Sequence, residues 1–137
     1  MSGLFLLPRW AQAPKSLGVL DGQLAEMPDT PNAVSSQAAS DHEGYMDPID
    51  WTGTQAEAIA AIQETVQSLP RTKIVTTRKN YLHAEFRSQW IGFIDDVEFY
   101  VPDAGGVIHF RSASRTGYSD LGVNRKRMER IVDRLSR

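Results

Sequence analysis

The chain has 137 residues, of which 41% are hydrophobic and 23% are charged, and its formal net charge is −2. These values are typical of one soluble globular domain, which at this size buries roughly two-thirds of its unfolded surface. Because the chain has no cysteine, disulfides, thiol nucleophiles, iron–sulfur clusters and cysteine-bound zinc are excluded.

The N-terminal part of the chain is predicted to be irregular. Residues 1–50 contain five of the seven prolines, and proline interrupts both helices and strands. We expect residues 1–16 to form a flexible segment and residues 17–137 to form a single domain. The apolar run at residues 4–7 stops at Pro8 and is too short for a signal-peptide core or a membrane span. The sequence as written therefore predicts a cytoplasmic protein without a transmembrane segment.

The first helix is predicted over residues 54–69. Thr54 and Glu57 have the spacing of a capping box, in which each side chain bonds the other residue's backbone amide. Pro70 marks the end of the helix. Its apolar side chains recur at three- and four-residue steps and form one stripe: Ile59, Ile62, Val66 and Leu69.

Four strands and a closing helix are predicted after Pro70. The strands span residues 73–77, 81–88, 94–101 and 107–112, and their short connections favour an antiparallel meander. The last helix is expected near residues 123–136, with Met128, Ile131 and Leu135 buried. The predicted fold is therefore α+β: a two-layer domain with a four-stranded antiparallel sheet, helices on one face and an irregular N-terminal segment.

Alternation along the predicted strands separates an apolar face from a polar one. The apolar face needs helices to cover it, whereas the other face collects ionisable side chains. The apolar set is Leu82, Ala84, Phe86, Val97, Phe99, Val101, Ile108 and Phe110. The polar set is Tyr81, His83, Glu85, Arg87, Asp96, Glu98, Tyr100, His109 and Arg111.

Three segments carry a family resemblance: residues 31–36 (PNAVSS), residues 95–99 (DDVEF) and the run from Arg111 to Arg125. With these motifs the chain resembles the family known as domain of unknown function 1499 over residues 17–135. The family has no established activity, so the resemblance implies membership and leaves function open. Relatives commonly have cysteine where this chain has Met27 and Ala33, which implies that those cysteines act as a pair. Many relatives are also exported or lipid-anchored.

The polar face is the first candidate site. His83, Glu85, Glu98 and His109 would converge if the strand registers agree, and two imidazoles with carboxylates suit a metal ion or acid–base chemistry. The alternative is a solvated face joined by Glu85–Arg87 and Glu98–Arg111 ion pairs.

The loop before the last helix is the second candidate. Arginines, serines and a helix N-terminus suit a phosphate or carboxylate, while the structural alternative has Arg115, Asp120 and Asn124 holding the loop against Asp95 or Asp96. The residues of this ligand site or polar network are Asp95, Asp96, Glu98, Arg111, Ser112, Ser114, Arg115, Ser119, Asp120, Asn124 and Arg125.

The basic run Arg125-Lys126-Arg127 suggests nucleic-acid binding as a third hypothesis. Glu129 and Asp133 in the same helix disfavour it, and so does the net charge of −2. No P-loop, His-Glu-x-x-His or Gly-x-Ser-x-Gly motif is present. We therefore predict a non-catalytic binding or interaction domain without a cofactor, whose partner is a small ligand or a protein. The alternative is a metal-assisted hydrolase that uses the polar face.

Overall fold

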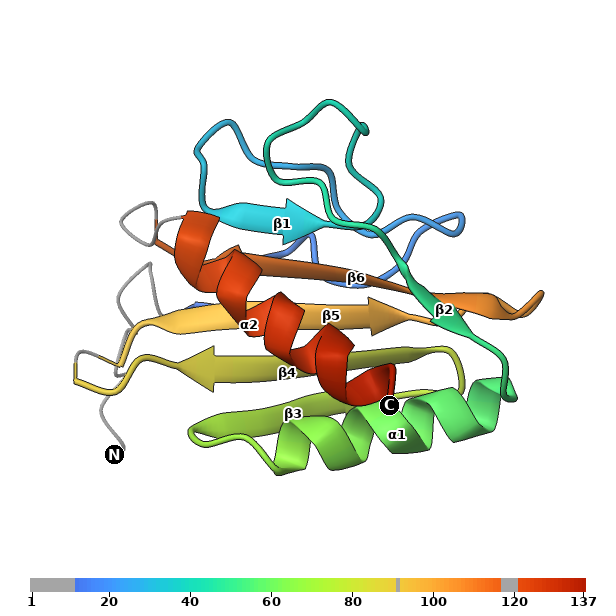
Figure 1. Cartoon of the computed structure of the whole chain (residues 1–137). Helices are drawn as coiled ribbons and strands as arrows, with labels where there is room; N and C mark the ends of the chain where they lie inside the picture. Colours follow the sequence, from blue (N-terminus) through green and yellow to red (C-terminus); the bar gives the residue numbers. More distant parts are fainter. Residues whose placement is uncertain (1–11, 91, 117–120) are drawn as a thin grey trace, which may run out of the picture.

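The structure is a computed structural model that describes residues 12–90, 92–116 and 121–137. In these ranges one antiparallel sheet is covered on one face by two helices (Figure 1). The elements in chain order are β1 (Ala33–Ser35), β2 (Ile49–Trp51), α1 (Gln55–Gln67), β3 (Thr72–Thr77), β4 (Tyr81–Arg87), β5 (Ile94–Tyr100), β6 (Gly106–Ser114) and α2 (Leu121–Leu135).

The α+β class is confirmed, but the sheet is larger than the predicted four-stranded meander. Strands β3 to β6 form the predicted antiparallel series, and the sheet order is β1-β6-β5-β4-β3, with β2 also paired to β6. The two additional strands come from the N-terminal region. Ala33 pairs with Ala113, and Ile49 pairs with Ile108. Each of these strands has three residues, which are too few for alternating polarity to reveal a strand. Together they supply hydrogen-bond partners to backbone N–H and C=O groups along an edge of β6.

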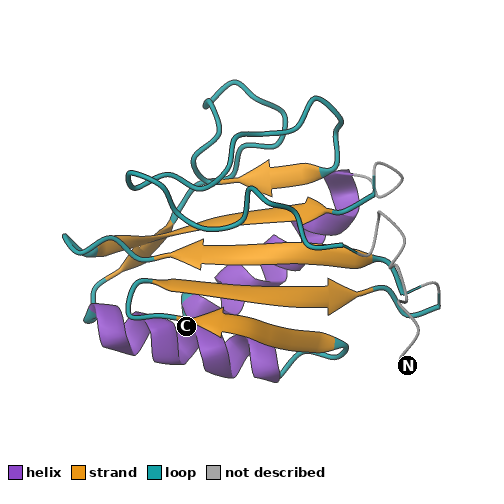
Figure 2. Cartoon of the chain, turned by 180° about the vertical axis from the view of Figure 1, so that it is seen from behind, coloured by secondary structure: helices purple, strands orange, loops and turns teal. Residues whose placement is uncertain are grey.

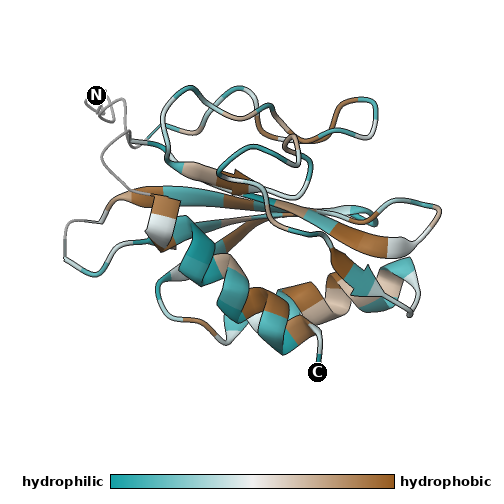
Figure 3. Ribbon diagram, turned by 45° about the horizontal axis from the view of Figure 1, so that its top comes forward, coloured by the Kyte–Doolittle hydropathy of each residue, from teal (hydrophilic) through white to brown (hydrophobic). Residues whose placement is uncertain are grey.

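The capping box of α1 is present as predicted. The amide of Glu57 donates to the Thr54 hydroxyl oxygen over 3.1 Å, and the amide of Thr54 donates to Oε1 of Glu57 over 3.0 Å. Bonding to the backbone and hydroxyl of Thr54 also holds the pKa of the Glu57 carboxyl below its usual range. The predicted stripes of both helices are buried, and Figure 3 shows hydrophobic and hydrophilic residues alternating along α2.

The core lies between the helices and the sheet face that the sequence marked as apolar. Leu82, Phe99 and Phe110 have no solvent exposure there, and Ile62 of α1 and Ile131 of α2 pack into the same cluster. Hydrophobic burial on this scale is the main term that stabilises a domain of this size. In the described ranges no helix is both long and apolar enough to cross a membrane.

The opposite sheet face is covered by chain without helix. Residues 12–26, here called the strap, pass over this face as an irregular segment, which is seen from behind the sheet in Figure 2. Residues 1–11 of the predicted flexible segment lie outside the described ranges. Much of the polar face is therefore buried and is not the solvated surface that the sequence allowed, although Arg87 remains exposed.

Candidate functional site

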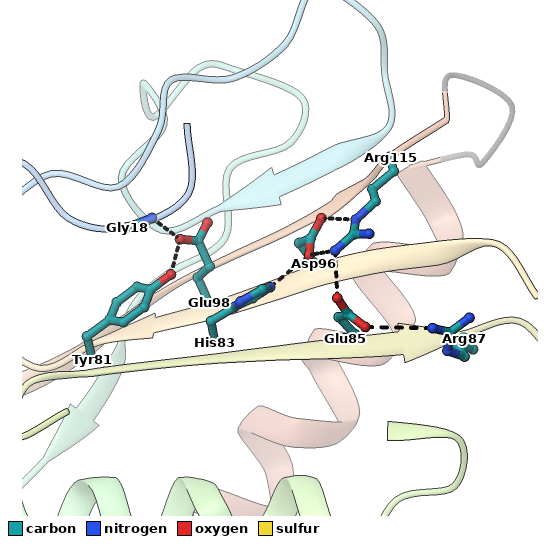
Figure 4. Close-up of polar contacts among 8 residues, drawn as sticks. All are labelled: Gly18, Tyr81, His83, Glu85, Arg87, Asp96, Glu98 and Arg115. Atoms are coloured by element: carbon teal, nitrogen blue, oxygen red, sulfur yellow. Dashed lines mark hydrogen bonds and ion pairs between the residues drawn. The ribbon is translucent and has the colours of Figure 1, made fainter. Parts of the chain in front are cut away.

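A buried ion-pair network crosses the polar face at β4, β5 and the end of β6. His83 Nε2 lies 2.7 Å from Oδ1 of Asp96. Arg115 donates from Nε to Oδ2 of Asp96 over 2.8 Å and from Nη2 to Oδ1 over 2.9 Å. The same Nη2 donates to Glu85 over 2.8 Å, and Arg87 approaches Glu85 at 3.8 Å (Figure 4). The carboxylate of Asp96 is thus held by an imidazole and a bidentate guanidinium.

The charges of this network compensate one another. Burial alone raises the pKa of Asp96, but the bonds from Arg115 and His83 outweigh it and hold that pKa below its usual range. The bond to Asp96 likewise raises the pKa of Arg115, whose side chain is only 3% exposed. Because an ionised carboxylate only accepts hydrogen bonds, His83 carries a proton on Nε2. Nδ1 is the other ring nitrogen, an acceptor in neutral imidazole and a donor in imidazolium, and it has no hydrogen-bond partner in the described ranges.

Glu98 fastens the strap to the same face. Its Oε2 accepts hydrogen bonds from the Tyr81 hydroxyl and, over 2.7 Å, from the amide of Gly18 (Figure 4). Burial and the bond to Glu98 raise the pKa of Tyr81, so the phenol remains protonated and keeps donating. Oε1 of Glu98 is buried without a partner. Glu98 is therefore a buried anchor for the strap.

Arg111 is buried directly opposite Glu98 on β6. The expected Glu98–Arg111 ion pair is wrong, because Nη2 of Arg111 instead donates to the carbonyl of Glu26 over 2.9 Å, and its Nε has no partner. Burial lowers the pKa of Arg111. Glu98 and Arg111 thus do not pair with each other, because each forms a hydrogen bond with the backbone of the strap.

Ser112, Ser114 and Asn124 of the predicted loop site form a second network on the helix-covered face. Asn124 accepts from the Ser112 hydroxyl over 2.7 Å and donates to Ser114 Oγ and the carbonyl of Asn32 over 3.1 Å each. These bonds join the start of α2 to β6 and to the chain just before β1. They are interior contacts that hold the helix on the sheet.

Neighbouring Asp95 and Asp96 point to opposite faces, and each has its own arginine. Arg115 holds Asp96, as the structural alternative expected. Asp95 is held by Arg127 over 2.7 Å, and the guanidinium of Arg127 also stacks 5.0 Å from the centre of the Phe86 ring. Arg127 was missed because the sequence shows it only as part of a basic run.

The remaining residues of the predicted loop site do not join these pairs. Arg125 donates to the carbonyl of Glu43, while Ser119 and Asp120 lie outside the described ranges.

His109 does not join the other candidate metal ligands. Its Nδ1 lies 3.0 Å from Ser36 Oγ, its ring stacks on Tyr100 with 6.4 Å between centres, and burial lowers its pKa. Glu85, Glu98 and His83 each have the separate partners described above. Across the described ranges, no three His, Asp or Glu side chains gather as a set suited to a metal ion.

Further contacts fix the C-terminal half of the strap. The amide of Leu24 donates to Gln37 Oε1 over 2.8 Å, and Nε2 of Gln37 donates to the carbonyl of Gly22 over 3.0 Å. Leu20 and Gln23 bond each other's backbone across a tight turn. Gly18, with φ of +109°, adopts a conformation that side chains rarely allow. The strap is consequently a defined structural segment despite having no helix or long strand.

A groove of about 1220 Å³ runs between the strap and the outer part of the sheet. Its floor includes Tyr81 and His83 of β4 and Tyr100 of β5, and nearly all of residues 13–26 line its wall. Two aliphatic side chains at the groove are unusually exposed: Leu20 at 78% and Val75 at 47%. Sequence reasoning missed the groove because no local pattern places the strap across the sheet.

Met27 and Ala33, the positions where relatives have cysteine, lie close together in space. A Cβ added to Gly44 would stand 2.6 Å from Cε of Met27 and 2.5 Å from the carbonyl oxygen of Ala33. Both positions thus border one glycine. The pairing of cysteines that the family resemblance implied for relatives remains an expectation.

Comparison with known proteins identifies the family. The sequence model of the family described as "Protein of unknown function (DUF1499)" matches residues 23–135, more than four-fifths of the chain. No curated protein and no solved structure gave a significant match. The family match covers β1 through α2 and the C-terminal part of the strap. The chain therefore belongs to the DUF1499 family.

Proposed function

We propose that this domain is a non-catalytic binding module that holds a small ligand in the groove between the strap and the sheet. The observation that carries the proposal is the position of Leu20 and Val75. These exposed aliphatic side chains both line one groove, which His83 also lines. Ligand sites commonly combine apolar walls with a few fixed polar groups in this way.

The loop before α2 has less support as the ligand site. Arg115 would have to leave Asp96 and Glu85 to clamp an anion, and those contacts are 2.8 to 2.9 Å long. Separating a buried ion pair costs about 3–5 kcal/mol. Arg111 is likewise engaged, with the carbonyl of Glu26. The arginines therefore support an architectural role better than a binding one.

The metal-assisted hydrolase is the second candidate and has less support than the groove. Its proposed ligands His83, Glu85, Glu98 and His109 have different partners, so a metal ion would have to replace several buried hydrogen bonds. A zinc or manganese titration separates the two hypotheses. A rise in melting temperature that is lost in His83→Ala and His109→Ala would favour the hydrolase.

The binding proposal can be tested with N-phenyl-1-naphthylamine, a neutral probe whose fluorescence rises in apolar surroundings. We expect saturable binding by the wild-type protein and at least about tenfold weaker binding by the double variant Leu20→Gln, Val75→Gln. The matched control is Val123→Gln on α2, because Val123 is 48% exposed and Val75 is 47% exposed. Equal binding by all three proteins, or no saturable binding by wild type, would overturn the proposal.

A further inference from the structure

Aliphatic side chains line the groove from the strap and from the sheet. Nearly every residue of the strap from 13 to 26 borders the groove, so it follows the strap along its length. Leu17, Val19 and Leu20 contribute from the strap, and Val75 contributes from the edge strand β3. An aliphatic chain would bury apolar surface against these side chains.

The charged side chains along the groove do not favour a charged ligand. Lys15 and Arg78 line it, and so do Asp21 and Glu26, which gives two cations and two anions. All four of these side chains belong to exposed residues. Solvent and salt screen exposed charges strongly. The polar recognition must therefore come from a group inside the groove.

His83 is that group, and its bond to Asp96 through Nε2 leaves Nδ1 as the ring nitrogen available to a ligand. The residue is 4% exposed and lines the groove. Its Nε2 donates a hydrogen bond to Asp96. Arg115 in turn holds Asp96 through two bonds (Figure 4). In its neutral form the ring offers the lone pair of Nδ1, which accepts a hydrogen bond from a ligand O–H and disfavours a carboxylate.

From this arrangement we propose that the groove binds a neutral amphiphile: an aliphatic chain whose polar end carries a hydroxyl that donates to Nδ1 of His83. The inference rests on the proposed function and adds the ligand class. Leu17, Val19, Leu20 and Val75 contact the chain, and His83 selects the head group. Asp96 and Arg115 are positioning residues, because they act through the orientation and proton position of the imidazole.

Three matched eight-carbon compounds test this class by displacing bound N-phenyl-1-naphthylamine. 1-Octanol donates a hydrogen bond, 1-methoxyoctane only accepts one, and octanoate is anionic at neutral pH. One buried hydrogen bond is worth about 1.4 kcal/mol, which is tenfold in affinity. We expect 1-octanol to displace the probe about tenfold more effectively than 1-methoxyoctane and octanoate. Equal displacement by 1-methoxyoctane, or better displacement by octanoate, would overturn the inference.

A substitution assigns the preference to His83. In His83→Phe, we expect 1-octanol and 1-methoxyoctane to displace the probe equally, with 1-methoxyoctane unchanged from wild type. An octanol preference that survives in His83→Phe would contradict the assignment. If this variant does not fold, the ¹⁵N chemical shift of His83 Nδ1 is measured in wild-type protein. We expect it to move on addition of 1-octanol and not of 1-methoxyoctane, and identical shifts with both would count against the proposal.

The two proposals can fail separately. Binding of N-phenyl-1-naphthylamine that depends on Leu20 and Val75, without an octanol preference, would leave the groove as a ligand site and reject the hydroxyl class. Absence of saturable probe binding would reject the groove itself, and the ligand class with it.

Discussion

The two faces of the sheet are both buried, but different interactions fill them. The helix-covered face packs apolar side chains such as Leu82, Phe99 and Phe110, whose contacts have no direction and fit closely. The strap-covered face buries His83, Asp96, Glu98 and Arg111, which need partners at defined distances. The helix-covered face therefore gains stability from buried apolar area, and the strap-covered face depends on specific hydrogen bonds and ion pairs.

This difference explains where a binding site can arise. Filling an apolar core leaves little free volume, whereas the strap spans a polar layer and leaves a groove beside it. Within the described residues, the polar layer also retains buried atoms without a hydrogen-bond partner, namely Oε1 of Glu98 and Nε of Arg111. The strap-covered face is therefore the one on which we propose a ligand site. The substitutions below test this contrast.

The largest expected loss comes from the helix-covered face. Phe99→Ala removes a fully buried ring from the middle of β5, and such a change costs about 3–5 kcal/mol of unfolding free energy. Urea denaturation followed by circular dichroism measures the loss. The folded fraction should still bind N-phenyl-1-naphthylamine, because Phe99 faces away from the groove. A loss below about 1 kcal/mol would mean that this face is not the main core.

Asp96→Asn is expected to cost nearly as much, about 3 kcal/mol, because it removes one of the two carboxylates that hold the buried Arg115 guanidinium and leaves only Glu85. The same urea experiment measures it. Asp133→Asn is the control, since Asp133 pairs with Arg137 at an exposed site, where ion pairs contribute at most about 1 kcal/mol. Similar losses in the two variants would show that the polar network does not stabilise the strap-covered face.

The pKa of Asp96 predicts a pH dependence. Because its folded-state pKa lies below its unfolded value of about 3.9, its stabilisation is complete at neutral pH. The unfolding free energy should fall as the pH drops below about 4, through the folded-state pKa. Asp96→Asn should lack this part of the dependence. Parallel stability curves for wild type and Asp96→Asn from pH 7 to pH 2 would contradict the compensation described for Asp96.

The smallest expected effect is local to the strap. Gly18→Ala meets no atom within 4 Å but must adopt φ of +109°, a strain of about 1–3 kcal/mol. We expect faster amide exchange in the strap and weaker probe binding, with β5 amides unchanged. Gly92→Ala is the control, because Gly92 also has positive φ and open surroundings and does not line the groove. Equal effects of both substitutions on strap exchange would contradict a local role for Gly18.

Local patterns in the sequence predicted much of the helix-covered face. The Thr54–Glu57 capping box, the helical stripes and the strand alternation each concern residues close in sequence, so they could be recognised without the fold. The additional strands β1 and β2 could not, because three residues carry no periodic signal. Their pairing depends on an edge of β6, which lies more than fifty residues away in the chain.

The polar face was predicted as a set of residues but not as a set of contacts. Alternation placed His83, Asp96 and Glu98 on one face, yet the strap determined their partners. Gly18 and the carbonyl of Glu26 bond Glu98 and Arg111 across about 80 residues of sequence. Backbone donors and acceptors have no sequence signature, so neither these anchors nor the groove beside them could be inferred beforehand.

The most direct test of the account is to locate the bound probe. Intermolecular nuclear Overhauser effects between N-phenyl-1-naphthylamine and the protein's methyl groups would show which side chains it touches. The account predicts effects from the methyls of both Leu20 and Val75, which border the groove from the strap and from β3. Effects confined to Val123 on α2, or to methyls of the helix-covered core, would contradict a ligand site beneath the strap.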